Sequence, residues 1–311
     1  MKSFYKPAAA FLFVFFANNC IAQNDSAEKK SFVKFNLNYL TNAIYFARKD
    51  SSPVPYLRSS ITYNDKSGFY IGGGISLLVN SNEPVRIDLA EIEAGYNFSK
   101  GKFDAGFYGS KYFYSNASFA VGSELKGLTG VYLGYNLGII NVGGGADLLY
   151  STNTDINANL NLSHEFESGE ENNHWKFTPT LQANAGSQYF NQAYYEFRKF
   201  TFPTKSANSG SSNGSSSGKG SGKGHSNSNN SGSGTTTPTV KTLTFYDRNR
   251  FTILDVELSV PINYEKKDWG LYANPVVGFP TNAATFAIDN AVQKEKLSTI
   301  FFTEIGAYIK F

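Results

Sequence analysis

Apolar and polar residues alternate with a period of two along most of the chain, and this pattern predicts β-strands. The segment 155–167 shows the alternation most clearly. One face carries Asp155, Asn157, Asn159, Asn161, Ser163, Glu165 and Glu167, and the other carries Ile156, Ala158, Leu160, Leu162, His164 and Phe166. Leu254, Val256 and Leu258 alternate with polar residues in the same way. Such strands separate two unlike environments, so the pattern alone fits both a sandwich and a barrel.

The predicted strands are long, and we count twelve of them. They span residues 32–40, 56–64, 68–79, 85–98, 102–113, 128–137, 139–150, 155–166, 175–188, 251–264, 269–277 and 299–311. Most reach the roughly 9 to 11 residues that a tilted strand needs to cross a bilayer, whereas soluble strands cluster at about 5 to 6. An even strand number is typical of bacterial outer-membrane barrels. We therefore predict an all-β fold, a transmembrane antiparallel up-and-down β-barrel.

The connections between these strands alternate between tight turns and longer loops. The turns are 65–67, 99–101, Gly138, 167–174 and 265–268, and the loops are 41–55, 80–84, 114–127, 151–154, 189–250 and 278–298. Outer-membrane barrels have short periplasmic turns and longer extracellular loops, so we place the second set outside the cell. The Ser/Gly/Asn-rich tract 206–237 holds too little apolar surface to offset the entropy of ordering, and we expect a disordered loop. It is a variable surface loop, a gate over the pore or an inert spacer.

Aromatic residues gather at the lipid-facing positions nearest the tight turns. They are Tyr63, Phe69, Phe98, Phe103, Phe166, Trp175, Tyr264, Trp269 and Phe311, and they include both tryptophans of the chain. Amphipathic rings favour the membrane interface. We therefore predict an aromatic girdle, for which Phe69, Phe103, Trp175, Tyr264 and Trp269 are the central positions, and lipid of the outer membrane around the barrel.

One predicted strand breaks the alternation. Val85, Ile87 and Leu89 are apolar on one face, but from Ile92 onward the apolar positions have the opposite parity. A β-bulge restores the phase of a strand in a barrel. We therefore predict a bulge near Ala90, with Val85, Ile87 and Leu89 facing lipid.

Two runs of glycine lie inside predicted strands, at Gly72–Gly74 and Gly143–Gly145. Glycine in a strand marks curvature and close backbone approach. The alternative is a gap left beside the glycines for the passage of a solute.

The first 22 residues have the features of a secretory signal peptide. Lys2 and Lys6 precede a short apolar stretch, and small residues surround a cleavage site near Ala22. Residues 23–31 form a periplasmic lead-in to the barrel at 32–311. The only cysteine, Cys20, leaves with the signal peptide, although a lipid-modified cysteine is the alternative. Removal of the two lysines lowers the formal charge from +3 to +1, so we expect no nucleic-acid partner. Without Cys20 the mature chain has no thiol, so we expect no thiolate metal site.

The C-terminal residues carry the most specific motif. Glu304, Gly306, Ile309 and the terminal Phe311 follow the order of a polar residue, a glycine, a hydrophobic residue and an aromatic residue at the chain end. This resembles the β-signal of bacterial outer-membrane proteins, by which the barrel assembly machinery recognises the last strand. The resemblance implies that these four residues are an assembly signal and that the protein lies in the outer membrane of a Gram-negative bacterium. The composition is also similar to that of small barrels of Bacteroidota.

Charged residues in the strands fall mostly on the face that points inward in a barrel. The acids assigned to the lumen are Asp88, Glu91, Glu93, Asp104, Asp147, Glu165, Asp255, Glu257 and Glu304, and the bases are Lys34, Arg58, Arg86, Lys176 and Lys310. Buried charges are usually paired, so a packed structural network and a water-filled conduit are equal alternatives. In a water-filled lumen an excess of carboxylates favours cations.

An enzymatic function is not expected. Twelve strands is also the count of outer-membrane phospholipase A, but the chain has only three histidines, His164, His174 and His225. Ser163 and His164 are adjacent in a strand and point to opposite faces, so they cannot form a nucleophile and base. His174 falls in a predicted turn and His225 in the Ser/Gly/Asn tract. No metal cluster, phosphate loop or nucleophile elbow is present, and we expect no cofactor.

These observations favour a porin-like channel for passive passage of small polar or cationic solutes. The expected lumen-lining residues are Asp104, Asp147, Asp255, Glu257, Glu304, Lys34, Arg58 and Lys176. The alternative is a structural or adhesive barrel, or a subunit of an envelope complex, whose lumen is closed and whose outer loops bind a partner. The identity of a protein partner does not follow from the sequence.

Overall fold

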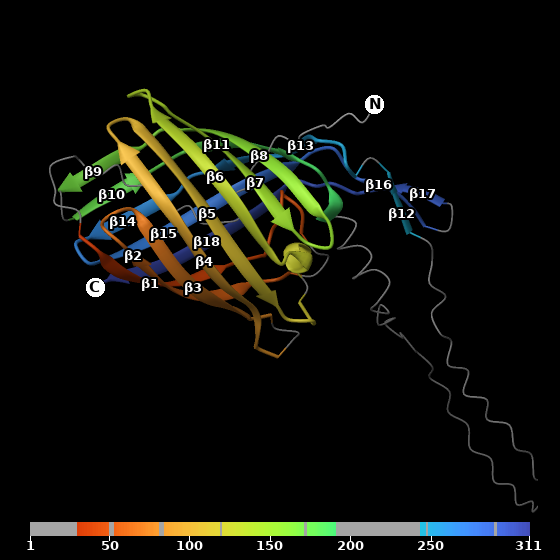
Figure 1. Cartoon of the computed structure of the whole chain (residues 1–311), viewed down its shortest axis with the longest axis horizontal. Helices are drawn as coiled ribbons and strands as arrows, with labels where there is room; N and C mark the ends of the chain where they lie inside the picture. Colours follow the sequence, from red (N-terminus) through yellow and green to blue (C-terminus); the bar gives the residue numbers. More distant parts are fainter. Residues whose placement is uncertain are drawn as a thin grey trace, which may run out of the picture.

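A computed structural model of the chain shows a closed antiparallel β-barrel (Figure 1). It describes residues 30–49, 53–80, 84–118, 120–170, 173–190, 243–246, 248–288 and 291–311. The signal peptide, residues 23–29 and the tract 206–237, with His225, lie outside the described residues. No helix within the described part is both long and apolar enough to cross a membrane.

The wall is built from twelve strands, three of which are each interrupted once. The uninterrupted strands are β1 (Phe32–Leu40), β2 (Tyr56–Asn64), β3 (Phe69–Leu78), β4 (Arg86–Lys100), β5 (Phe103–Tyr114), β6 (Gly127–Asn136), β7 (Asn141–Tyr150), β15 (Trp269–Pro280) and β18 (Ile300–Lys310). The interrupted strands are β8 (Thr154–Ser163) with β9 (Phe166–Glu170), β10 (Asn173–Phe177) with β11 (Thr180–Gly186), and β13 (Thr252–Ser259) with β14 (Ile262–Lys266). Each strand pairs with its neighbour in the chain, and β1 closes the barrel against β18.

Prolines mark the irregular part of the wall. Pro179 lies between β10 and β11, Pro261 lies between β13 and β14, and Pro275 lies within β15. A proline lacks the N–H that a strand ladder needs. The proline carbonyls still accept bonds from the next strand: Thr178 donates to Pro261 at 2.9 Å and Val260 donates to Pro275 at 3.2 Å. The three prolines therefore form a seam across neighbouring strands.

The tight turns and the longer loops lie at opposite ends of the barrel, which we call the inner end and the outer end. The C-terminus lies at the inner end, beside β9 and β10 (Figure 1). Three connections differ from the sequence prediction. The predicted turn 167–174 continues as the strands β9 and β10, so the hairpin is longer. The predicted outer loops 189–250 and 278–298 contain a second sheet.

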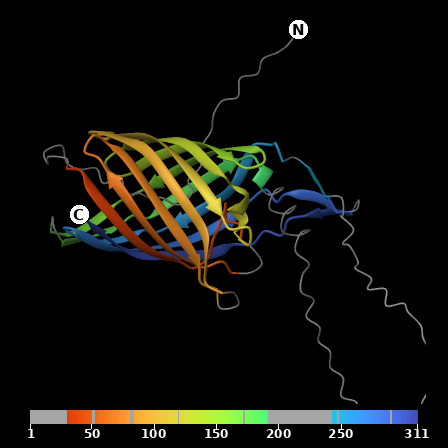
Figure 2. The same ribbon diagram turned by 60° about the horizontal axis from the view of Figure 1, so that its bottom comes forward.

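This second sheet has three strands, β12 (Leu243–Tyr246), β16 (Thr285–Ile288) and β17 (Ala291–Lys294), in the order β12–β16–β17. Figure 2 shows it projecting beyond the outer end of the barrel. Its strands are four residues long, which is short enough to resemble loop in the sequence. The sequence prediction missed this sheet.

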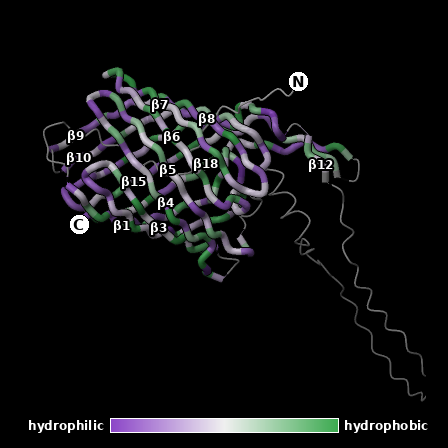
Figure 3. The backbone as a smooth tube through the Cα atoms, in the orientation of Figure 1, coloured by the Kyte–Doolittle hydropathy of each residue, from purple (hydrophilic) through white to green (hydrophobic). Residues whose placement is uncertain are grey.

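The two faces of the wall differ in polarity, as the alternation predicted. Outward side chains are apolar and exposed, among them Leu37, Ile61, Phe107, Leu133, Leu160 and Phe301. Their neighbours in the strands, such as Asn36, Thr62, Asn159 and Glu304, point inward. Figure 3 shows the resulting alternation of hydrophobic and hydrophilic positions along the strands. An outer surface of this kind suits a hydrocarbon environment.

Inward glycines provide room for large side chains of the next strand. A Cβ atom on Gly106 would lie 2.5 Å from the ring of Tyr132, and one on Gly95 would lie 2.7 Å from the ring of Tyr70. The same relation joins Gly130 to Tyr108, Gly270 to Tyr308 and Gly306 to Tyr272. At these five positions a tyrosine ring packs directly against the backbone of a glycine in the neighbouring strand.

The two predicted glycine runs have the same function. A Cβ on Gly72 would meet Thr62 at 2.8 Å, and a Cβ on Gly143 or Gly145 would meet the side chain of Asn161 or Asn159 at 2.6 or 2.8 Å. The space beside these glycines is filled by neighbouring side chains. The suggestion of a gap for solute passage is therefore wrong, and close packing explains the glycines.

Two β-bulges change the parity of the wall near the outer end. In β4 the register shifts between Ile87 and Leu89, so Asp88 is the additional residue. This confirms the predicted bulge near Ala90, but Leu89 is buried and does not face lipid. In β13 the register shifts between Ile253 and Asp255, so Leu254 is the additional residue and is fully buried. The alternation had placed Leu254 with the outward Val256; the bulge turns it inward.

Candidate functional site

The inner half of the lumen is polar and reached by solvent. Asn36, Ser60, Thr62, Asn161 and Gln182 point inward from four strands, and all of them keep partial exposure. Deeper in the barrel, both polar side-chain atoms of Asn157 and of Asn159 have no hydrogen-bond partner among the described residues, and neither has Oδ2 of Asp147. Buried polar atoms in proteins are bonded to water where protein partners are lacking. We therefore infer that the middle of the lumen is hydrated.

Carboxylates are concentrated in the middle of the lumen. Glu304 lies in β18, where its Oε1 accepts hydrogen bonds from Asn38 and Tyr272, both at 3.0 Å. Arg58 in β2 contacts Glu91 at 3.1 Å. On the other side of the barrel, Asp255 and Glu257 share the inner face of β13, and Asn184 donates to Asp255 at 2.6 Å.

Asp147 is a further acid of the middle layer, as is Glu93 of β4. Asp147 accepts a 2.6 Å hydrogen bond from Tyr108, whose ring lies over Gly130. Asp147 is 1% exposed. The middle layer therefore holds more carboxyl groups than basic side chains.

The inner end of the lumen carries both signs of charge. The amino groups of Lys34 and Lys310 lie 4.3 and 5.2 Å from the ring centroid of Tyr308. Lys176 lies 3.6 Å from Glu165. Asp104 lies on the inner face of β5, opposite Gly134. The sequence-predicted lining residues are thus all on the inner face, but they form two layers, a middle layer of acids and an inner layer of mixed charge.

The outer end of the barrel is closed by apolar side chains. Two clusters meet there, and we call them together the plug. The first contains Tyr45, Phe46, Leu89, Tyr112, Val121, Leu125, Leu128, Leu149, Phe190 and Leu254, and the second contains Leu40, Ala47, Val54, Tyr56, Leu78, Val276, Ile300 and Phe302. The sequence did not predict which loop residues form the plug, because these residues lie in connections whose apolar positions show no clear period.

Three connections enter the barrel to form the plug. The β1–β2 loop supplies Tyr45, Phe46 and Ala47, the short 3-10 helix η1 (Val121–Glu124) lies in the β5–β6 connection, and Phe190 follows β11. The ring centroids of Tyr45 and Phe190 are 4.8 Å apart. The wall contributes the bulged Leu89 and Leu254, so both bulges aim a leucine into the plug.

The tip of the β1–β2 loop is a tight turn in a strained conformation. Tyr45 and Arg48 exchange two backbone hydrogen bonds of 2.9 and 3.0 Å. Phe46 and Ala47 between them have φ angles of 49°. Two successive positive φ values define a type I′ turn, which normally requires Gly or Asn. Strain of this kind persists only where the surroundings hold it, and it concentrates at functional sites.

Arg48 fixes the plug to the outer connections. Its Nε lies 3.0 Å from Oε1 of Glu295, and its other nitrogens donate to the carbonyls of Phe46, Leu254 and Thr281 at 3.0, 3.3 and 3.0 Å. Arg48 is 5% exposed. We call the Arg48–Glu295 pair the latch. It joins the β1–β2 loop to the segment that follows β17.

Two buried carboxylates hold the other parts of the plug. Asp155 accepts hydrogen bonds from the backbone N–H groups of Tyr189 and Phe190 at 2.8 and 2.7 Å, which fixes Phe190 in the plug. The bulge in β4 turns the buried Asp88 toward the interior, where its carboxylate accepts hydrogen bonds from the hydroxyls of Tyr56 and Ser118. These contacts could not be predicted, because each joins residues more than 29 positions apart.

The histidines do not form a catalytic arrangement with a described serine. His164 contacts the carbonyl of Ile139, and His174 lies 3.5 Å from Glu167 and 3.6 Å from Glu265. His174 is in β10 on the inner face, which corrects its prediction as a turn residue. Among the described residues, no three His, Cys, Asp or Glu side chains are grouped as a metal site would need.

The aromatic residues of the predicted girdle lie on the outer face near the inner end. Trp175, Tyr264 and Trp269 form a continuous row, with ring centroids 4.9 and 5.6 Å apart. Phe69 and Phe103 are exposed on strands further round the wall. Ile309 in β18 and Phe311, which follows the strand, are exposed, while Glu304 and Gly306 of β18 face inward. Glu304 and Gly306 both contact Asn38 and Tyr272.

No protein-family model matches the chain, and no curated protein matches it in sequence. Several solved structures share the barrel. They include the KdgM porin (8% identity, TM-score 0.43, covering 89% of this chain and 99% of that chain), the NanC porin (9%, 0.41, 90% and 100%) and LpxR from Salmonella typhimurium (7%, 0.44, 89% and 99%). At such identities and TM-scores these structures carry no argument about this chain. Its twelve-stranded barrel is established by its own strand pairing.

Proposed function

We propose that this chain is a gated channel of a bacterial outer membrane, through which small polar or cationic solutes pass when the plug moves. The observation that carries the proposal is the contrast within one lumen. The inner half of the lumen is polar and its middle is rich in carboxyl groups, whereas the outer end is filled by apolar side chains from both the loops and the wall. A barrel that served only as a scaffold has no need of a hydrated interior with unpaired amides and carboxylates, because buried unpaired polar groups cost stability.

The outer surface of the barrel supports a location in the outer membrane. The exposed apolar wall and the row formed by Trp175, Tyr264 and Trp269 suit a bilayer and its interface. We propose that the signal peptide is removed near Ala22, and that Ile309 and Phe311 are read by the assembly machinery, since both are exposed at the end of β18.

The latch provides the first test. Replacing Arg48 by Ala leaves Glu295 buried without its partner, which destabilises the closed plug by about 3 to 5 kcal/mol in comparable buried pairs. We expect Arg48→Ala to raise the open probability strongly in planar-bilayer recordings. Lys49→Ala is the matched control, because Lys49 is the exposed neighbour in the same loop. The proposal fails if Arg48→Ala, shown to be folded by heat-dependent mobility in gels, passes no current at any voltage.

A second candidate function is supported by the sheet β12–β16–β17. It stands beyond the outer end, and Val292 on β17 is 65% exposed. Open edge strands of this kind are templates for pairing with another chain. In this reading the lumen stays closed and the sheet binds a protein partner. Removing residues 285–294 would then abolish adhesion of expressing cells without affecting current, whereas loss of the tract 206–237 would alter current only if it acts as a gate.

A further inference from the structure

A basic cavity opens between the small sheet and the outer end of the barrel. It has a volume of about 200 Å³ and is lined by residues that include Arg250, Lys294, Tyr246, Gln188 and Asn282. None of its lining residues is acidic. None of its lining residues belongs to the two apolar clusters of the plug or to the predicted lumen lining, and the channel proposal gives the cavity no function.

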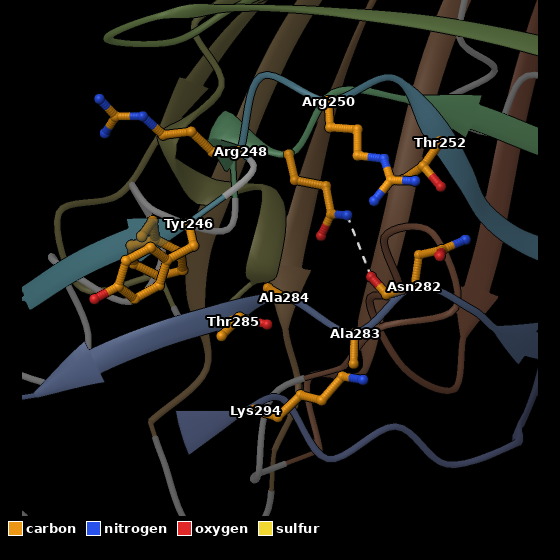
Figure 4. A pocket seen from close by; sticks show the side chains of 11 residues that line it. Tyr246, Arg248, Arg250, Thr252, Asn282, Ala283, Ala284, Thr285 and Lys294 are labelled. Atoms are coloured by element: carbon orange, nitrogen blue, oxygen red, sulfur yellow. Dashed lines mark hydrogen bonds between the residues drawn. The ribbon is translucent and has the colours of Figure 1, made fainter. Parts of the chain in front are cut away.

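Three basic residues, Arg248, Arg250 and Lys294, line the cavity, and the last two reach it from different elements. Arg250 comes from the chain just before β13, and Lys294 is the last residue of β17. Figure 4 shows the Arg250 side chain directed toward the segment Asn282–Thr285, with Lys294 below that segment and Arg248 turned away. Both cations are exposed, and neither pairs with a carboxylate in the part of the chain that the structure describes.

Hydrogen bonds hold the floor of the cavity in place. The Gln188 amide donates to the carbonyl of Asn282 at 3.2 Å, and the Asn282 amide donates to the carbonyl of Ile253 at 2.6 Å. Asn282 has a φ of 51°, a left-handed conformation that an asparagine tolerates better than most residues. The floor of the cavity is therefore a fixed turn, and the cations are presented by the chain just before β13 and by β17.

We propose that this cavity binds a small organic oxyanion, a carboxylate or phosphate carried on a ring. Arg and Lys together match an oxyanion, since guanidinium makes paired bonds to it and ammonium adds a point charge. Tyr246 at the rim is 45% exposed and offers an apolar face for the ring. The volume lies below the roughly 300 to 1,000 Å³ of drug-sized pockets, so it accommodates a compound of about one sugar ring. The proposal does not depend on conduction.

The charge of the lining residues sets the sign of the ligand. Arg250 and Lys294 attract anions, and this attraction falls as salt is added. Anion binding should therefore weaken with rising ionic strength.

The test is titration calorimetry of the whole purified barrel in a zwitterionic detergent. The probes are glucuronate, glucose 6-phosphate and neutral glucose. We expect both anions to bind and glucose not to bind. Arg250→Gln and Lys294→Gln should each weaken binding about tenfold or more, as loss of a charged hydrogen-bond donor does. Lys126→Gln is the matched control, because it removes the same charge from an exposed residue at the outer end that does not line the cavity.

Each alternative result decides the matter. Equal binding of glucose and glucuronate, or no binding of either anion, overturns the proposal. An equal loss in Lys126→Gln and Arg250→Gln shows diffuse surface attraction and overturns it too. A final titration uses a soluble short-chain phosphatidylglycerol. If this lipid binds and glucose 6-phosphate does not, the cavity is a lipid-headgroup site and the proposal of a soluble ligand is rejected.

Discussion

Gly106 shows that single positions decide how the wall is packed. A Cβ there would lie 2.5 Å from the Tyr132 ring and 2.6 Å from a backbone oxygen of Tyr96, and neither can move cheaply. We expect Gly106→Ala to lower the free energy of unfolding by about 1 to 3 kcal/mol, the usual cost of overpacking. Urea unfolding in detergent micelles measures it.

Gly134→Ala is the control for this substitution. Gly134 also points inward, on the neighbouring strand β6, but the nearest atom to its added Cβ is 3.7 Å away. Alanine there should be neutral or stabilise the barrel by up to about 1 kcal/mol through the unfolded chain. Equal destabilisation by both substitutions would contradict the packing argument.

Asp65 in the β2–β3 turn should titrate at unusually low pH. Hydrogen bonds from the side chain and the backbone N–H of Ser67, and from the Ser31 hydroxyl, hold the pKa of its carboxyl well below the ordinary value. A depressed pKa means that the turn gains stability above the unfolded pKa, near 3.9, and loses it only as pH falls through the lower folded value.

An NMR titration of the Asp65 side chain checks this. The carboxyl should remain ionised at about pH 3, and Ser31→Ala should raise its pKa because one donor, at 3.0 Å, is removed. An unchanged titration in Ser31→Ala would show that this hydroxyl does not bond to the carboxylate in solution.

At the scale of elements, the bulges connect the wall to the plug. Leu254 is fully buried because the bulge in β13 turns it inward, whereas Leu258, four residues later, is 49% exposed on the outer face. Leu254→Ala should cost about 2 to 5 kcal/mol of stability by leaving a cavity in the plug. Leu258→Ala should change the stability measured in detergent far less. Similar losses in both variants would mean that Leu254 is not part of a packed plug.

The same elements show where sequence reasoning succeeded and where it stopped. Alternation correctly assigned the faces of the segment 155–163, because a regular strand has a strict period of two. It misplaced Leu254, because a single extra residue reverses the parity of everything on one side of it. The bulge near Ala90 could be predicted, since the apolar positions on both sides of it were in conflict.

Contacts between distant connections were not predictable. Arg48 and Glu295 are 247 positions apart, and nothing local to either residue indicates a pair. Asp155 was correctly placed on the polar face of its strand, but its bonds to Tyr189 and Phe190 depend on where the chain leaves β11. The sequence therefore predicted the barrel, and the plug, the latch and the basic cavity required the folded chain.

At the scale of the whole molecule, the two charged layers of the lumen should act in opposite directions. In a barrel opened by Arg48→Ala, Asp255→Asn combined with Glu257→Gln should reduce the preference for K⁺ over Cl⁻, because it removes two charges from the acidic layer. Lys34→Gln, at the inner end, should increase that preference. Reversal potentials across a KCl gradient measure both. If neither variant moves the reversal potential, ions do not pass these layers.

The proline seam makes the barrel mechanically uneven around its circumference. Pro179, Pro261 and Pro275 remove N–H donors from neighbouring strands, so this sector is held by fewer ladder bonds than the rest of the wall. Deuterium should enter the amides of β10, β11, β13 and β14 sooner than those of β4 and β5. If the barrel wall opens laterally toward the bilayer, neighbouring strands should separate in this sector first.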